Sequence, residues 1–129
     1  MSSVVGVWRL VKATATGPNG EALPPPYGAK PTGTLTLTAE GRMLAVTCDG
    51  RPEMPAGGPE REFNSYCGNY TFDGKTLITR VDAAANRAWI GGEQVRAVKI
   101  DGNRIILRPP PRPLGDSTQQ RELTWERVG

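Results

Sequence analysis

Apolar and polar residues alternate with a period of two through most of this chain, and this alternation restricts the fold to one built from β-strands. Short turns, such as Asp73-Gly74 and Asp101-Gly102-Asn103, separate the alternating segments. The pattern predicts about eight strands. Their expected ranges are 6–14, 32–38, 42–48, 65–72, 75–82, 93–100, 104–108 and 121–128.

Three long loops rich in proline and glycine lie between the expected strands, at residues 17–31, 49–64 and 109–120. Such loops suit the rim of a barrel, and the middle one is either a plain connection or a lid over the mouth. A single helical turn is expected from Glu60 to Asn64. The sequence therefore predicts one all-β domain over residues 1–129, an eight-stranded antiparallel up-and-down barrel with little or no helix.

The chain contains no histidine, and this excludes a Ser-His-Asp triad, a His-ligated haem and a His-based metal centre. Its two cysteines, Cys48 and Cys67, are too few for a zinc site. The first residues do not resemble a signal peptide, so we expect free thiols and a cytoplasmic location. We expect no metal and no cofactor.

The net charge is +3, and the 16 Lys and Arg residues are scattered along the chain. A nucleic-acid-binding domain usually shows a dense basic stripe, so no nucleic-acid partner is expected. No apolar run is long enough to span a bilayer, so no membrane association is expected either. The expected partner is a small molecule, and the protein is expected to be a monomer or a homodimer.

Several motifs occur in the order typical of one family. The chain opens with Gly6-Val7-Trp8, which is similar to the Gly-x-Trp opening strand of lipocalin-type barrels. The clearest stretch runs from Trp89 to Arg96. Further matching segments are Tyr27-Gly28, residues 31–35, Gly41-Arg42-Met43, residues 66–70 and the closing strand 123–128. Together they resemble the lipocalin-like domain family of small bacterial and fungal proteins over nearly the whole chain.

This resemblance implies a barrel with a cavity large enough for a ligand, but it implies no single reaction. Similar small barrels include carriers and enzymes, among them cyclases of natural-product pathways. The chain departs from the family pattern at Thr79, where many relatives have a histidine. Residues 51–64 are also shorter and richer in glycine than in relatives, which implies a smaller or looser lid.

Alternation within the segment 93–100 decides which side chains enter the barrel. Gln94, Arg96, Val98 and Ile100 share the more apolar face, so this face is expected inside. Two interpretations of a buried Arg96 remain open. It either braces the barrel through a buried carboxylate or carbonyl groups, or it lines the cavity floor with the Tyr70 hydroxyl. In the second case the two groups would hold a carboxylate, enolate or phenolate oxygen.

Glu93 and Trp89 are two further candidates beside the glycine pair Gly91-Gly92. Glu93 has the chemistry of a general base, but alternation directs it away from Arg96, and the alternative is a solvated carboxylate. Trp89 precedes the glycines in a loop, where it either lines the rim or plugs the loop. Core packing is expected for the other two tryptophans, Trp8 and Trp125, with an arginine stacked on an indole (Arg9, Arg121 or Arg127).

The sequence thus predicts a protein that binds a small, largely apolar organic molecule with one polar or anionic end inside a barrel. The candidate lining residues are Leu35, Leu37, Met43, Tyr66, Tyr70, Thr79, Trp89, Gln94 and Arg96. The alternative is a cofactor-free isomerase or cyclase that acts on such a molecule, with Arg96, Tyr70 and Glu93 as candidate catalytic residues. A third class is an interaction protein with a filled barrel and no cavity.

Overall fold

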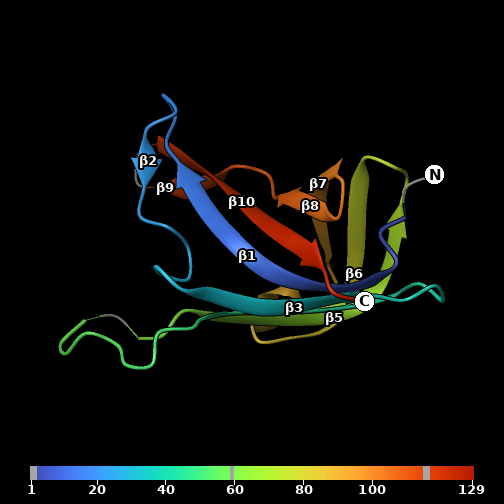
Figure 1. The fold of residues 1–129 in the computed structure, drawn as a ribbon, viewed down its shortest axis with the longest axis horizontal. Helices are drawn as coiled ribbons and strands as arrows, with labels where there is room; N and C mark the ends of the chain where they lie inside the picture. The colour runs from blue at the N-terminus through green and yellow to red at the C-terminus, as the bar shows by residue number, and fades with distance from the viewer. Residues whose placement is uncertain (1–2, 59, 115–116) are drawn as a thin grey trace.

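The strands of this protein close into a barrel in the computed structural model, which describes residues 3–58, 60–114 and 117–129 (Figure 1). The barrel strands are β1 (Gly6–Thr16), β3 (Pro31–Leu37), β4 (Arg42–Asp49), β5 (Phe63–Phe72), β6 (Thr76–Ala84), β7 (Glu93–Asp101), β8 (Arg104–Arg108) and β10 (Ser117–Arg127). Each pairs with its neighbours in antiparallel fashion, and β1 pairs with both β3 and β10. This second pairing of β1 closes the ring of eight strands.

The predicted all-β barrel is confirmed, and each of the eight expected strands has a counterpart in the structure. Two short strands arise inside the expected loops: β2 (Ala22–Leu23) pairs with β1, and β9 (Arg112–Leu114) pairs with β10. The helical turn expected at residues 60–64 is wrong. Phe63 and Asn64 instead pair with β4, which satisfies their backbone groups without a helix. The described helical structure is one 3₁₀ turn, η1 (Arg87–Trp89).

The end of the barrel nearest the two chain termini is closed by the N-terminal segment (Figure 1). The Trp8 indole donates a hydrogen bond to the carbonyl of Val4 (3.0 Å), and both side chains are buried. The Arg127 guanidinium lies 4.2 Å from the centre of the Trp8 ring and donates to the carbonyl oxygens of Ser3 and Val5. The predicted stacking of an arginine on an indole is therefore formed by Arg127 and Trp8.

The three long loops gather at the opposite end of the barrel, together with β2 and β9 (Figure 1). This end stays open. Buried apolar residues pack the interior between the two ends, and on β3, β4, β6 and β8 they come from alternate positions. Among the largest and most completely buried are Trp8, Leu35, Leu37, Met43, Leu77, Ile105 and Trp125.

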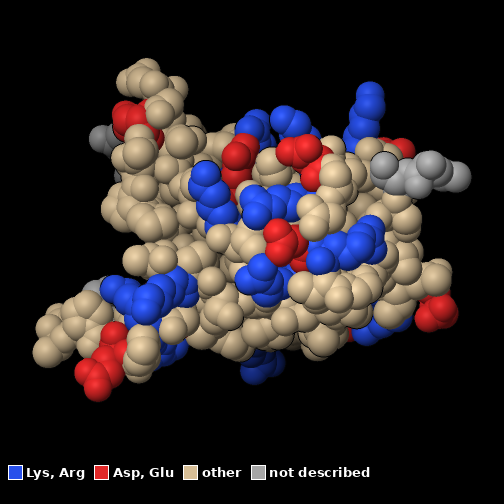
Figure 2. All heavy atoms as spheres, in the orientation of Figure 1, with Lys and Arg blue, Asp and Glu red and all other residues tan. Residues whose placement is uncertain are grey.

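Opposite charges alternate on the outer surface across β1, β8 and β10. Glu126 pairs with both Arg9 (2.8 Å) and Arg104 (3.2 Å), and Glu122 pairs with Arg108. Figure 2 shows the basic and acidic side chains interspersed on this face. Exposed pairs of this kind contribute little stability. Because acidic side chains lie between the basic ones, the face that Figure 2 shows has no dense basic stripe.

Cys48 and Cys67 are free thiols on β4 and β5, as expected, and no disulfide joins them. The Cys67 thiol donates a hydrogen bond to Asp82 (3.4 Å). Burial raises the pKa of the Cys67 thiol, and the neighbouring carboxylate acts in the same direction. Because the thiolate is the nucleophilic form, this thiol is poorly suited to covalent chemistry.

Candidate functional site

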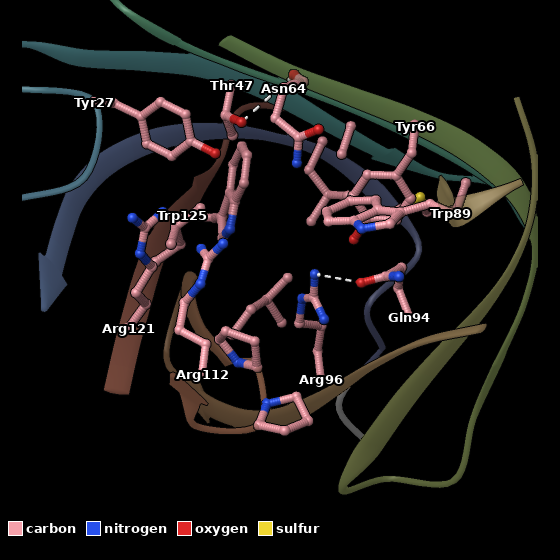
Figure 3. Close-up of a pocket in the computed structure, with 17 residues that line it drawn as sticks. Tyr27, Thr47, Asn64, Tyr66, Trp89, Gln94, Arg96, Arg112, Arg121 and Trp125 are labelled. Atoms are coloured by element: carbon pink, nitrogen blue, oxygen red, sulfur yellow. Dashed lines mark hydrogen bonds between the residues drawn. The ribbon is translucent and has the colours of Figure 1, made fainter. Parts of the chain in front are cut away.

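A cavity of about 260 Å³ occupies the barrel interior at its open end (Figure 3). Its apolar wall is formed by aliphatic side chains of β3, β4, β8 and β10 together with aromatic rings. The aliphatic members are Leu35, Met43, Ala45, Leu107 and Leu123. Cavities for drug-sized ligands usually measure about 300–1,000 Å³, so this one suits a molecule of one or two rings.

A cluster of aromatic and polar side chains forms one side of the cavity (Figure 3). The rings of Tyr66 and Trp89 pack edge to face, with 5.3 Å between their centres and 84° between their planes. The Arg96 guanidinium lies 6.0 Å from the centre of the Tyr66 ring and donates to the side-chain oxygen of Gln94 (3.2 Å). Burial raises the pKa of the Tyr66 phenol, although Arg96 acts against this. The phenol is therefore neutral and can donate a hydrogen bond.

Arg96 has no carboxylate partner among the described residues. Besides Gln94, its guanidinium donates to the neighbouring backbone carbonyl of Val95 (2.9 Å). Both of these acceptors belong to its own strand, and the contact that reaches another strand is the one with the Tyr66 ring on β5. Its side chain lies on the inner face of β7, as the alternation predicts, and lines the cavity.

A second polar cluster surrounds the mouth of the cavity. Glu62 accepts a hydrogen bond from the backbone N–H of Tyr27 (2.8 Å) and pairs with Arg121 (3.2 Å). Tyr27 is buried and has a positive φ of 64°, which is uncommon for a bulky residue and often marks a functional position. Burial raises the pKa of its phenol, while hydrogen bonding with Thr47 and Asn64 acts in the opposite direction. Glu62, in the loop before β5, thus links the loop that contains Tyr27 to β10 beside the mouth of the cavity.

The cavity wall is basic. Among its 17 lining residues are three arginines, Arg96, Arg112 and Arg121, and no Asp or Glu. Glu62 neutralises Arg121 from outside the lining. Within the described ranges, neither Arg96 nor Arg112 pairs with a carboxylate. An anionic group in the cavity would therefore be stabilised by two uncompensated positive charges.

The structure brings six of the nine residues expected to line a cavity into this one. These six are Leu35, Met43, Tyr66, Trp89, Gln94 and Arg96. Leu37 and Thr79 point into the barrel and are fully buried, but they do not line the cavity. Thr79 is part of the packed interior of the barrel.

Tyr70 does not share a cavity floor with Arg96. Its hydroxyl donates to the carbonyl of Thr38 (2.7 Å), and its ring borders a surface groove beside Val4 and Val5 at the closed end. The expected pair of Arg96 and Tyr70 is therefore not formed. The physical reason is that alternation fixes the face on which a side chain lies, but not its height along the barrel axis.

Glu93 is exposed on the outer face of β7 and does not line the cavity, which agrees with its alternation relative to Arg96. Of the two interpretations of residues 49–64, the described part of the segment favours a plain connection over a lid. Asn64 is its single described residue in the cavity wall, and residues 50–58 extend away from the barrel (Figure 1). Asp49 holds this segment through a 2.6 Å ion pair with Arg51, which lowers the pKa of the Asp49 carboxyl.

Sequence reasoning missed several lining residues. Ala45 and Thr47 alternate with Met43 on β4, and Arg121 and Leu123 alternate with Trp125 on β10, so these could have been found. Leu107 alternates with Ile105 on β8 and could also have been found, and Asn64 lies at the start of β5, just before the expected strand. Other missed residues come from loops and a short edge strand, where no periodic signal exists. They include Tyr27, Pro109, Pro110 and Arg112.

Trp125 was expected only in the core. It is buried, with 2% of its surface exposed, and it also lines the cavity. Its indole N–H has no acceptor among the described residues. In Figure 3 the nitrogen end of this indole is directed into the cavity.

An antiparallel eight-stranded barrel with an interior cavity belongs to the class of small barrels whose interior has room for one small ligand. A family model described as a lipocalin-like domain matches residues 5–128. The chain belongs to this lipocalin-like family, as the order of its motifs indicated. No curated protein shows significant sequence similarity to it.

No group of three or more Cys, Asp or Glu side chains that could hold a metal ion occurs in residues 3–58, 60–114 and 117–129. None of the described helical structure is long and apolar enough to cross a membrane.

Proposed function

We propose that this protein binds a small, largely apolar organic molecule with one polar or anionic end in the cavity at the open end of the barrel. Barrels of the lipocalin-like family generally hold small hydrophobic ligands. The observation that carries the proposal is the cavity itself, which has an aliphatic and aromatic wall and a few convergent polar groups. A filled barrel would leave no such space.

Binding is favoured over catalysis on the geometry of the polar groups. The isomerase or cyclase alternative relied on Arg96 and Tyr70 acting on one oxygen, and on Glu93 as a base. Tyr70 lies at the closed end, and Glu93 points to solvent. No carboxylate that could serve as a base lines the cavity among the described residues.

The proposal is tested with 2-naphthoate, a two-ring probe with one anionic end, by isothermal titration calorimetry. Ala45 is buried in the cavity wall, so Ala45→Leu fills part of the space that the probe needs. We expect this variant to fold and to bind 2-naphthoate at least roughly tenfold more weakly than the wild type.

Ala83→Leu is the matched control, because Ala83 is exposed on the outer side of β6. It makes the same chemical change and is expected to leave the affinity unchanged. If both variants bind the probe as the wild type does, the probe lies outside the barrel and the proposal fails. Absence of binding to the wild type would also contradict it.

A further inference from the structure

The Trp125 indole is a hydrogen-bond donor without an acceptor in the part of the chain that the structure describes. An indole N–H can only donate, so a neighbouring donor cannot satisfy it. The same group in Trp8, which is buried to a similar extent, is satisfied by the Val4 carbonyl. Buried donors are normally paired, and each exception needs an explanation. Here the unpaired N–H faces a cavity rather than packed side chains.

The cavity as a whole has more donors than acceptors. Its three arginines carry only donors, and the Tyr66 and Tyr27 phenols keep their protons because their pKa values are raised. The side-chain oxygen of Gln94 is already occupied by Arg96. A bound molecule that supplies acceptor oxygens therefore matches the excess of donors in the lining.

The charges of the lining residues also favour a ligand with acceptor oxygens. Two of the three arginines lack a carboxylate partner among the described residues, and the lining contains no acid. Water could accept from Trp125, but it would leave the half-buried Arg96 without an anionic partner. An anionic oxygen satisfies the donor and the charges together.

We infer that the ligand is a small unsaturated or aromatic organic carboxylate, one of whose oxygens accepts the Trp125 indole N–H while its charge is balanced by Arg112 and Arg96. This inference rests on the proposed function and specifies the polar end of the ligand. The volume of about 260 Å³ restricts the apolar part to one or two rings.

Three probes of similar shape separate the contribution of a negative charge from that of a neutral acceptor oxygen. Cinnamate carries the anion, cinnamamide keeps a neutral acceptor oxygen, and trans-β-methylstyrene has neither. We expect cinnamate to bind wild-type protein roughly ten- to a hundredfold more tightly than cinnamamide, as a charged hydrogen bond predicts. Cinnamamide should in turn bind about three- to tenfold more tightly than trans-β-methylstyrene. Affinities are measured by calorimetry.

Trp125→Phe removes the donor and keeps an aromatic ring. We expect it to reduce the preference for cinnamamide over trans-β-methylstyrene to nearly one. Trp89→Phe is the matched control, because Trp89 also lines the cavity but its indole N–H is not a buried, unpaired donor. Trp89→Phe should weaken the binding of all three probes to a similar extent and preserve the preference for cinnamamide over trans-β-methylstyrene. Arg112→Gln should reduce the preference for cinnamate over cinnamamide.

The outcomes separate this inference from the proposed function. If trans-β-methylstyrene binds as tightly as cinnamate, the protein is a barrel for apolar ligands and the inference is overturned alone. If Trp125→Phe and Trp89→Phe change the preferences equally, the role of the indole N–H is overturned. If neither these probes nor 2-naphthoate binds the wild type, the proposed function fails as well.

Discussion

Replacing Gly68 by alanine is expected to lower the free energy of unfolding by about 2–3 kcal/mol, since overpacking of a close backbone contact costs this much. Gly68 follows a register shift between β5 and β6. A Cβ atom there would lie 1.8 Å from the carbonyl oxygen of Arg80 and 3.1 Å from the Cα of Val81. Both are backbone atoms of the paired strand, so relief requires β6 to move and not a side chain to rotate.

Thermal unfolding followed by circular dichroism tests this prediction, and we expect the melting temperature to fall by roughly 5–10 °C. Gly92→Ala is the control, because the nearest atom to a Cβ there is 3.5 Å away, and its φ is not in the left-handed region. Its melting temperature should be unchanged or slightly higher. Equal melting temperatures for the two variants would contradict the close approach of β5 and β6.

Replacing Arg96 by methionine is expected to weaken 2-naphthoate binding roughly ten- to a hundredfold, which corresponds to the loss of a charged hydrogen bond of about 1.5–3 kcal/mol. The same variant should unfold at nearly the wild-type temperature. Among the described residues, the guanidinium donates to Gln94 and to the Val95 carbonyl on its own strand and lies over the Tyr66 ring. Its loss therefore leaves no buried carboxylate unpaired among the described residues.

Affinity and melting temperature are measured on the same Arg96→Met preparation. Arg80→Met is the matched control, since Arg80 is exposed on the outer side of β6 and does not line the cavity. It removes one positive charge without touching the site, and both quantities should stay at wild-type values. A sharp loss of stability in Arg96→Met would assign Arg96 a structural role. Unchanged affinity would remove it from the binding site.

The barrel could be predicted from the sequence because each strand carries its own period-two pattern. β7 illustrates this, since its alternation alone placed Gln94 and Arg96 inside and Glu93 outside. Turn residues such as Asp73-Gly74 then separated the strands. Closure of the ring depends on pairing of β1 with β10, which the similarity to barrel families indicated before the structure placed it.

Height along the barrel axis could not be predicted, because it depends on the register between strands. Thr79 pairs with Tyr70 on one side and with Gln94 on the other, yet only Gln94 lines the cavity. Leu37 has the same inward orientation as Leu35 but lies beyond the cavity. One strand face therefore contributes both to the packed interior and to the site.

The residues at the mouth of the cavity could not be predicted from sequence patterns for a different reason. Tyr27 and Arg112 come from loops and a three-residue strand, where side-chain direction follows local backbone geometry and has no period. Tyr27 lines the cavity with its backbone at a positive φ, and no pattern in the neighbouring residues indicated this conformation. The role of Trp125 depends on what surrounds its nitrogen, and only the folded structure shows that.

Binding inside the cavity is tested most directly by finding where a bound molecule lies. Protein labelled with ¹³C at the methionine methyl groups is mixed with 2-naphthoate, and nuclear Overhauser contacts between probe and methyl protons are measured. Met43 is buried in the cavity wall, whereas Met54 lies outside it in the segment that extends from the barrel. We expect contacts from the naphthalene ring to Met43 and none to Met54. Contacts to Met54 alone, or binding without any contact to Met43, would contradict it.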